Sequence, residues 1–403
     1  MLKRSAKKIG VGGAIISPYA KRLVNKVLDT GRISYGPFLR RFENEFAKLC
    51  GRKFAISSNS GTSSLQVAIH SLKDLYGWKD GDEVLVPSVT FVATSNVVLQ
   101  NKLNPVFVDV DDKMYHMNPE LIEDKITKRT RAILPVHLMG VSADMARITK
   151  IAKEHRLKVI EDSCEAVGVN YHGKPVGSFG DIACFSTYMA HLVATGVGGL
   201  SVTDNPKLAV LMRSLVNHGR DSIYVSMDDD KGLRGHERFH MANSRFSFVS
   251  VGYSYRLTEF EGAMGLAELK SLRKNIFIRQ KAADYLIRAL RPFEKYLQLP
   301  SWPEHAEHAF MLFPIVIREG AGFSRDDLVH HLEDYNVETR YLMPLINQPI
   351  YKKMFGDLEK HYPVARHINK NGFYIGCHPE MDKKDLDYVA AVFNEFFEKR
   401  KLA

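Results

Sequence analysis

The chain has 403 residues, of which 45% are hydrophobic and 25% charged, the mixture of an ordinary globular protein large enough for two domains. Its formal charge is +10, but acidic residues are interspersed among the basic ones, and no segment approaches the roughly 20 apolar residues that cross a bilayer. These features disfavour disordered, nucleic-acid-binding and membrane-spanning proteins, and the N-terminal sequence lacks the apolar core of a secretory signal, so we expect a cytoplasmic protein.

Two helices are predicted at the start of the chain, before an alternating pattern begins. The amphipathic segment SPYAKRLVNKVLDTG is stopped by Gly31, and SYGPFLRRFENEFAKLCG is a turn that leads into a second helix. From Lys53, β-rich runs alternate with helical stretches: KFAISS, SGTSSLQVAIHSLKDL, EVLVPSVTF, PVFVDVD, RAILPVHL, DMARITKIAKEHR and LKVIEDS. This alternation predicts an α/β domain with a large, mostly parallel sheet.

The rest of the chain is predicted to complete this sheet and to add a smaller domain. DIACFSTY, GGLSVTD and the later HAFMLFPIVI are candidate strands. The segment MDDDKGLRGHERFHMANSRF, at 227–246, has the composition of a polar loop, which could contact a substrate or simply lie in solvent. A long helical stretch begins at EFEGAMGLAEL, and within it we place the boundary between a large domain, 1–270, and a small α+β domain, 271–403.

The segment SGTSSL follows a predicted strand and opens a helix. Gly61 allows a tight turn, and Thr62 and the free amides of the helix N-terminus can hold a phosphate. Ser60 and Thr62 are also residue types that commonly do no more than cap a helix. Ser186, in CFSTY, precedes the glycine-rich turn TGVGG, which lets a ligand approach the backbone closely.

Asp162 and Phe91 lie at the ends of two other predicted strands. A carboxylate at the carboxyl end of a parallel strand can keep a pyridine nitrogen protonated, although Asp162 could also cap the next helix. Phe91, in SVTFVATSN, could stack on a flat ring or belong to the core. The four cysteines lie far apart in the sequence, which predicts free thiols and no metal or iron–sulfur site.

Taken in order, the motifs of the chain resemble those of the DegT/DnrJ/EryC1/StrS sugar aminotransferases, from about Gly36 to near the C-terminus. The motifs are GPFLRRFENEFAKLCG, SGTSSLQVA, VPSVTFVATSN, PVFVDVD, ILPVHLMG, VIEDSCEAVG, GSFGDIACFS, TGVGGLSVTD, NHGRD, GYSYRLTEFEGAMGLAEL and QPIY. The resemblance implies a fold-type I, aspartate aminotransferase-like enzyme that uses pyridoxal 5′-phosphate (PLP). It further implies a nucleotide-sugar substrate and a homodimer whose subunits share their active sites.

The resemblance also assigns a role to each candidate residue. The implied cofactor-binding residues are Ser60, Gly61, Thr62, Phe91, Asp162, Glu165, Ser186, His191 and Ser254. The implied substrate-binding residues are Tyr253, Arg256 and Arg340, and the segment from Tyr253 to Arg256 would act in the site of the neighbouring subunit. Two positions depart from the family pattern, since Ser254 stands where asparagine is usual and Glu165 where many members have glutamine.

The decisive departure is His191, five residues after Ser186, where the aminotransferases have the lysine that anchors the cofactor covalently. Imidazole cannot form a stable imine, but its ordinary pKa of about 6.5 suits proton transfer at neutral pH. A branch of the family with this replacement contains the 3-dehydratases of nucleotide-linked 4-keto-6-deoxyhexoses. The resemblance implies that the pyridoxamine form (PMP) of the cofactor condenses with the sugar C4 ketone, that His191 removes a proton, and that the C3 hydroxyl leaves as water.

We therefore predict a PLP-dependent dehydratase in which His191 and Asp162 are catalytic and glutamate recharges the cofactor. GDP-4-keto-6-deoxy-D-mannose 3-dehydratase is the nearest named activity. Two alternatives stay open: a nucleotide-sugar aminotransferase, or a lysine-to-histidine variant of one, and a PLP-binding sensor without catalysis. The loops that would read the nucleotide and the sugar leave the identity of the substrate open.

Overall fold

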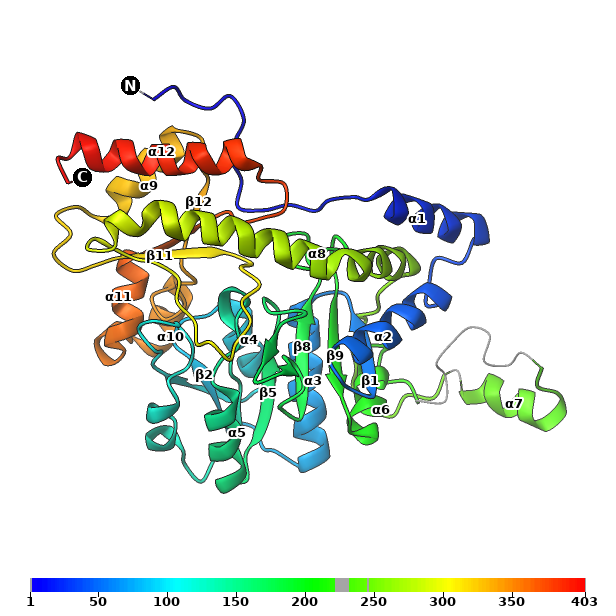
Figure 1. The fold of residues 1–403 in the computed structure, drawn as a ribbon. Coiled ribbons are helices and arrows are strands. Elements are labelled where there is room, and N and C mark those ends of the chain that lie inside the picture. The colour runs from blue at the N-terminus through cyan, green and yellow to red at the C-terminus, as the bar shows by residue number, and fades with distance from the viewer. Residues whose placement is uncertain (1, 222–231, 245, 403) are drawn as a thin grey trace.

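The structure, a computed structural model, describes residues 2–221, 232–244 and 246–402, and a large sheet lies at its centre (Figure 1). Its strands are β1 (Phe54–Ser58), β2 (Glu83–Pro87), β3 (Asn104–Val108), β4 (Thr130–Ile133), β5 (Lys158–Asp162), β8 (Ile182–Ser186) and β9 (Gly199–Thr203). They lie in the order β1-β9-β8-β5-β4-β2-β3. Within the described part of this sheet, β9 alone runs antiparallel to its neighbours, and the other paired strands are parallel. The predicted large, mostly parallel sheet is confirmed.

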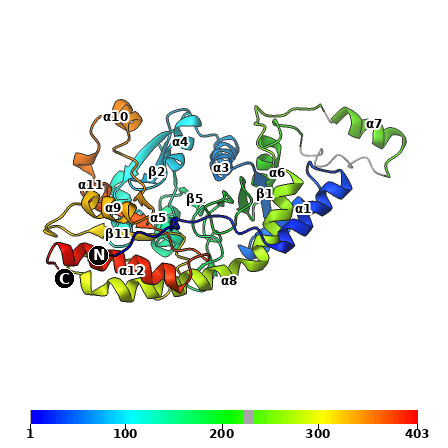
Figure 2. The same ribbon diagram turned by 90° about the horizontal axis from the view of Figure 1, so that it is seen from above.

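Helices cover both faces of this sheet, as Figure 2 shows for α3 on one side and α8 on the other. The helices of the large domain are α1 (Pro18–Thr30), α2 (Pro37–Leu49), α3 (Gly61–Tyr76), α4 (Val92–Gln100), α5 (Met145–Glu154), α6 (Pro206–Leu215) and α8 (Glu259–Leu290). The predicted end of the first helix is confirmed, since Gly31 adopts a left-handed φ of 65° after α1.

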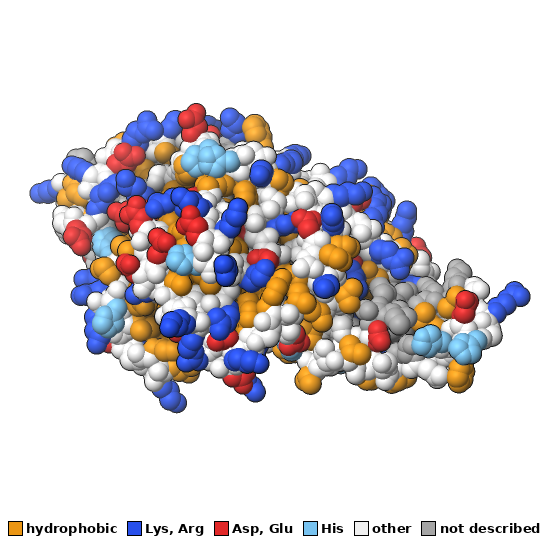
Figure 3. All heavy atoms as spheres, turned by 90° about the horizontal axis from the view of Figure 1, so that it is seen from below, with side chains coloured by type: hydrophobic (Ala, Val, Ile, Leu, Met, Phe, Trp, Pro, Cys, Tyr) orange, Lys and Arg blue, Asp and Glu red, His pale blue; other side chains and the backbone are white. Residues whose placement is uncertain are grey.

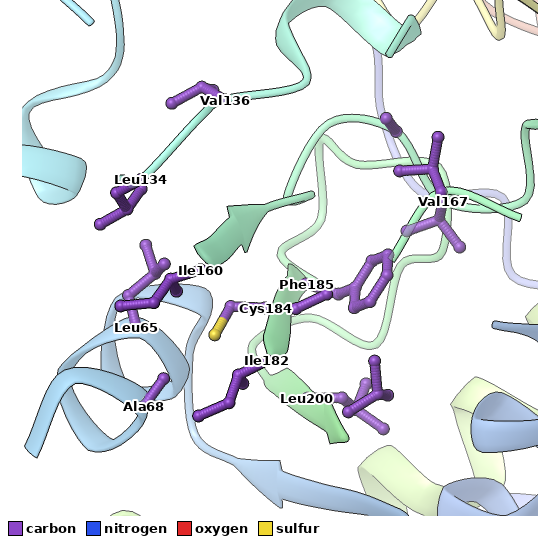
Figure 4. Close-up of a cluster of buried hydrophobic side chains, with 14 of the residues drawn as sticks. Leu65, Ala68, Leu134, Val136, Ile160, Val167, Ile182, Cys184, Phe185 and Leu200 are labelled. Carbon is purple, nitrogen blue, oxygen red and sulfur yellow. The ribbon is translucent and has the colours of Figure 1, made fainter. Parts of the chain in front are cut away.

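The strands are buried on both faces because each face packs against helices. On β8, Cys184 points toward α3 together with Ile182, whereas Phe185 points to the opposite side with Leu200 (Figure 4). Residues two apart on a strand share a face, so Ser186 lies on the same side as Cys184. The strand thereby brings the Ser186 hydroxyl to the beginning of α3.

A second, smaller sheet lies beside the large one. Its strands are β10 (Leu297–Gln298), β11 (Phe313–Ile317), β12 (Thr339–Tyr341) and β13 (Gly372–Ile375), which pair antiparallel in the order β10-β11-β13-β12. Its helices are α9 (Arg325–Asp334), α10 (Pro349–Phe355), α11 (Pro363–Asn371) and α12 (Lys383–Lys399). Short elements complete the described chain: the hairpin β6 (Asn170–Tyr171) and β7 (Lys174–Pro175), and the 3-10 helices Pro119–Leu121, Glu123–Lys125, Leu138–Gly140, Arg291–Phe293 and Glu359–His361.

The predicted boundary at residue 270 falls inside α8, which runs unbroken from Glu259 to Leu290. Thr258 and Glu261 form a capping box that fixes where this helix begins. The N-terminal segment also reaches the smaller part, where Ile9 N–H donates to the Asn336 carbonyl at 2.8 Å. The helix α8 therefore belongs to both parts, and the division 1–270 and 271–403 stays a prediction.

The predicted polar loop at 227–246 is wrong for part of its length. Residues 227–231 and 245 lie outside the described residues, but Gly235–Ser244 form a helix, α7, that stands away from the body of the protein (Figures 1 and 2). Glu237 lies in its first turn, where a negative charge favours the helix dipole. The segment GHERFHMANS has no apolar stripe, which is why its sequence did not indicate a helix.

The surface mixes charges of both signs. Figure 3 shows Lys and Arg side chains interspersed with Asp and Glu and with hydrophobic side chains over one face. Within the described ranges, no helix is both long enough and apolar enough to span a membrane.

Candidate active site

The start of α3 forms one end of the candidate site. Ser60 is the N-cap residue, and its Oγ accepts a hydrogen bond from Ser63 N–H at 3.0 Å. A Cβ atom at Gly61 would lie 2.7 Å from Ser186 Cβ and 2.9 Å from Cys164 Sγ, so only glycine fits between these segments. Thr62 is exposed on the first turn of the helix. The free amides of this turn and the Thr62 and Ser186 hydroxyls form a surface suited to a phosphate.

Asp162, at the end of β5, lies at the other end of the candidate site and is 5% exposed. Its Oδ2 accepts a hydrogen bond from Thr94 Oγ1 at 2.8 Å, and its Oδ1 accepts one from Cys164 N–H at 3.3 Å. Burial raises the pKa of this carboxyl, and no Lys or Arg among the described residues forms an ion pair with it. A cationic ring nitrogen would supply the missing positive charge.

The contact of Thr94 with Asp162 was not predicted from the sequence. Thr94 lies three residues after Phe91, one turn into α4, and its N–H donates to the Phe91 carbonyl at 3.2 Å. A threonine inside a helical segment has no feature that marks it as a partner of a carboxylate 68 residues away. Phe91 itself precedes α4, and 61% of its surface is exposed. A flat ligand ring would cover it.

His191 follows β8 and turns its ring toward the loop that leaves β5. Its Nδ1 lies 2.6 Å from the carbonyl oxygen of Cys164. Because a carbonyl can only accept, Nδ1 carries the hydrogen, and Nε2 of the neutral ring is left as a base. Burial lowers the pKa of His191 to about 4, so the imidazole is neutral at pH 7 and able to take a proton.

Glu165 lies in the loop that leaves β5, after Asp162 and Cys164. Its side chain is 7% exposed, and Oε2 accepts a hydrogen bond from Met139 N–H at 2.6 Å. Burial, with a smaller effect from the charge of Asp162, raises the pKa of Glu165 to about 7. This stretch of chain therefore contributes three groups: the carboxyls of Asp162 and Glu165, and the Cys164 carbonyl that orients His191.

Tyr253 does not join these groups within the chain. Its hydroxyl lies 2.8 Å from His70 Nδ1 and accepts a hydrogen bond from Gln66 Nε2 at 3.2 Å, so it is held against α3. Arg340 pairs through its guanidinium with Glu338, donates to the Thr339 carbonyl and lies opposite Tyr374 of β13.

Ser254 and Arg256 lie on a different cavity of about 520 Å³. Arg256 donates to Asn217 Oδ1 at 2.9 Å and to Ser254 Oγ at 3.0 Å. The lining residues are Ser34, Tyr35, Glu43, Ile56, Ser57, Arg213, Val216, Asn217, Arg220, Ser254, Arg256, Leu257 and Thr258. Neither Asp162 nor His191 borders this cavity, so a single chain does not bring Ser254 and Arg256 to the candidate site.

All four cysteines are free thiols, as predicted, and three of them are buried. In the described part of the chain, no group of three or more His, Cys, Asp and Glu side chains could hold a metal ion.

A model of the DegT/DnrJ/EryC1/StrS aminotransferase family matches residues 15–394. The chain is 34% identical over 371 residues to UDP-N-acetyl-3-dehydro-alpha-D-glucosamine 3-aminotransferase of Acidithiobacillus ferrooxidans, which covers 92% of this chain and 91% of that protein. It is 33% identical over 380 residues to dTDP-4-dehydro-2,6-dideoxy-D-glucose 3-dehydratase of Saccharopolyspora spinosa, covering 91% and 82%.

Among solved structures, GDP-4-keto-6-deoxy-D-mannose-3-dehydratase of Escherichia coli with bound hydrated PLP matches with a TM-score of 0.86 and 27% identity. The match covers 95% of this chain and 98% of that one. The predicted fold type is thus confirmed. Because an aminotransferase and a dehydratase are about equally similar in sequence, overall identity does not decide between the two activities.

Proposed function

The chain belongs to the DegT/DnrJ/EryC1/StrS aminotransferase family, and on this premise we propose that it is a PLP-dependent 3-dehydratase of a nucleotide-linked 4-keto-6-deoxyhexose. The matched relatives act, by their names, on sugars linked to UDP, dTDP or GDP, and one was solved with PLP, which supports the class of substrate and the cofactor. We further propose glutamate as the amino donor and a homodimer in which Tyr253, Ser254 and Arg256 complete the neighbouring site.

The residues present fit PLP. The buried Asp162 carboxylate has hydrogen-bond donors but no cationic partner among the described residues, and the exposed ring of Phe91 offers a face on which a pyridine could stack. The first turn of α3 and Ser186 would hold the phosphate. When bound in its PMP form, the cofactor supplies an electron sink joined to C4 of the sugar.

His191 is the observation that carries the proposal. Its Nδ1–H donates to the Cys164 carbonyl at 2.6 Å, so Nε2 is the atom that would take a proton from carbon and would pass it to the departing sugar C3 hydroxyl, which leaves as water. A lysine at this position would displace the sugar and complete an amine exchange. Imidazole cannot do so, and elimination has time to occur.

The proposal is tested by incubating the protein with PLP, glutamate and a GDP- or dTDP-linked 4-keto-6-deoxy sugar, and following the sugar by mass spectrometry. We expect the sugar to lose its C3 oxygen as water while glutamate becomes 2-oxoglutarate and its nitrogen is released as ammonia. The His191→Asn variant should lose about 10²- to 10⁴-fold in rate, the usual contribution of a general base. His155→Asn is a matched control, since His155 lies on the surface beside Glu123.

The same experiment separates the alternatives. Transfer of nitrogen to C4 would show an aminotransferase, and a protein that binds PLP but changes no sugar would be a sensor. In His191→Lys, borohydride should fix the cofactor to the chain and dehydration should be suppressed. Full dehydratase turnover by that variant would refute the role given to the imidazole.

A further inference from the structure

The helix α7 contains a motif to which the proposed reaction gives no role. Its residues 236–240 read HERFH, so His236 and His240 stand four positions apart, with Glu237 directly after the first of them. This H-E-x-x-H order is the one in which a helix presents two imidazoles to a zinc ion. So short a motif also arises by chance, so the helix that carries it and the surroundings of that helix must support a metal site.

The motif lies on a formed helix, which is what its spacing requires. The helix runs from Gly235 to Ser244, so both histidines lie within it, about one turn apart. Residues at i and i+4 share a helix face and place their Cβ atoms about 5–6 Å apart, which lets two imidazoles turn one nitrogen each toward a common point. Both side chains are exposed, so an ion can reach them from solvent. The second nitrogen of each ring can keep a hydrogen bond while the first binds a metal.

The surroundings of α7 leave its stability to be explained. The helix stands away from the body of the protein in both ribbon views (Figures 1 and 2), and its Phe239 side chain is 65% exposed. Its 10 residues are fewer than the roughly 12–15 at which an isolated helix becomes marginally stable in water. An ion that joins His236 to His240 across one turn would supply part of this stability, because it binds the helical form in preference to the unfolded one.

We propose that His236 and His240 form a binding site for a divalent transition-metal ion of the zinc class. Imidazole nitrogen is a favoured ligand of Zn²⁺, Ni²⁺ and Cu²⁺, whereas Mg²⁺ and Ca²⁺ prefer oxygen ligands. No third His, Cys, Asp or Glu from the described residues joins the pair, so these residues supply two ligands and water fills the remaining positions. The site requires neither PLP nor the sugar, and it stands or falls independently of the dehydration proposal.

The position of the motif distinguishes this site from that of a metallopeptidase. In those enzymes the glutamate of the motif acts as a base on a metal-bound water beside the substrate. Here Glu237 is exposed on a projecting helix, and neither histidine borders the cavity of about 520 Å³ that Arg256 lines. The proposed role of the ion is therefore to bind and order α7, with its open coordination positions facing solvent.

Zinc binding tests the site directly. The full-length chain is titrated with Zn²⁺ in competition with a chromophoric chelator, alongside His236→Ala and His240→Ala. We expect the wild type to bind one more ion than either variant, because losing the second imidazole should weaken binding about 10²-fold. Amide hydrogen exchange of residues 235–244 should slow when Zn²⁺ is added to the wild type, should not slow in the variants, and should not respond to Mg²⁺.

The spacing of the two histidines has a matched control. The double variant His240→Ala, Met241→His keeps the number of histidines but separates the pair by five residues, which turns the two rings to different sides of the helix. It should therefore behave like His240→Ala in both measurements. His155→Ala removes a surface histidine beside Glu123 and should leave the slowing of exchange in α7 intact.

Three results would overturn the site. The first is the same number of zinc ions, bound with the same affinity, in the wild type and in both single variants. The second is an equal slowing of exchange by Zn²⁺ in the double variant, which would show that the helical spacing does not matter. The third is an equal slowing by Mg²⁺, which would indicate a general effect of divalent ions in place of imidazole ligation.

Discussion

Replacing Thr94 with valine removes one hydroxyl group from the buried support of Asp162 and keeps the branched shape of the side chain. Thr94 is fully buried, and its Oγ1 lies 2.8 Å from Asp162 Oδ2. The same Oγ1 also shares a hydrogen bond with Thr90 at 2.8 Å, which holds it in this orientation. The variant therefore removes one of the hydrogen bonds that favour the ionised form of Asp162, and the pKa of Asp162 should rise further above its usual range.

The size of the effect follows from the kind of bond that is lost. A hydrogen bond to a charged group contributes about 1.5 to 3 kcal/mol. If PLP binds with its ring nitrogen against ionised Asp162, this loss corresponds to roughly 10- to 150-fold weaker binding. The stability of the protein without cofactor should change less than its affinity for PLP, because the unsupported Asp162 can relieve its charge by taking up a proton.

The assay is a PLP titration followed by absorbance at constant pH, with a urea unfolding curve for each protein. Thr203→Val is a matched control, since Thr203 is also fully buried and donates to the Asp181 carbonyl at 2.8 Å, but lies at the far end of β9. We expect it to lower stability by about 0.5 to 1.5 kcal/mol and to leave PLP affinity unchanged. PLP binding by Thr94→Val within twofold of the wild type would refute the reasoning, and so would an equal loss of affinity in Thr203→Val.

Three further predictions concern the same site. Gly61→Ala would force a Cβ to 2.7 Å from Ser186 Cβ, so urea unfolding should show a loss of about 1 to 3 kcal/mol, whereas Gly13→Ala, whose Cβ meets Glu380 Oε2 only at 3.7 Å, should cost far less. Phe91→Ala should leave the melting temperature nearly unchanged, because the ring is 61% exposed, and weaken PLP binding by about 0.5 to 1.5 kcal/mol of lost stacking; equal affinity would contradict a stacking role. The pKa of His191 is lowered to about 4, so the imidazole is neutral above that value and protonated below it. The acid limb of kcat/KM should therefore lie well below pH 6.5, and a limb at 6.5 would contradict this.

The strands and their ends could be predicted from the sequence because short runs of neighbouring residues determine them. The run LKVIED has the apolar centre Val159–Ile160 and ends in carboxylates, which indicates a buried parallel strand with Asp162 at its ligand-binding end. Gly61 could be predicted for a similar reason, since the strand that precedes it and the serines that follow indicate a tight turn into a helix. The structure adds the cause, which is the close approach of Ser186 and Cys164.

Contacts that depend on tertiary packing could not be predicted in the same way. The helix α4, with the sequence VATSNVVLQ, has its apolar residues in no helical stripe, so neither the helix nor the role of Thr94 was predicted. Cys164 orients His191 through its backbone carbonyl, and no residue type signals such a contact. The acceptor role of Glu165 Oε2 likewise depends on the strained Met139, whose left-handed conformation a methionine rarely adopts.

A histidine in place of lysine can act as a base here only if the right ring nitrogen is free of hydrogen. The Cys164 carbonyl meets this geometric requirement, which the replacement alone would not meet. A neutral imidazole acts as a base only through the nitrogen that carries no hydrogen, and the two tautomers are close in energy unless an acceptor selects one. Here the acceptor is a backbone oxygen in the loop between Asp162 and Glu165, which fixes Nε2 as the free nitrogen. The loop that binds the proposed ring nitrogen therefore also sets which atom of His191 can move a proton, so a change in the path of this loop should alter cofactor binding and proton transfer together.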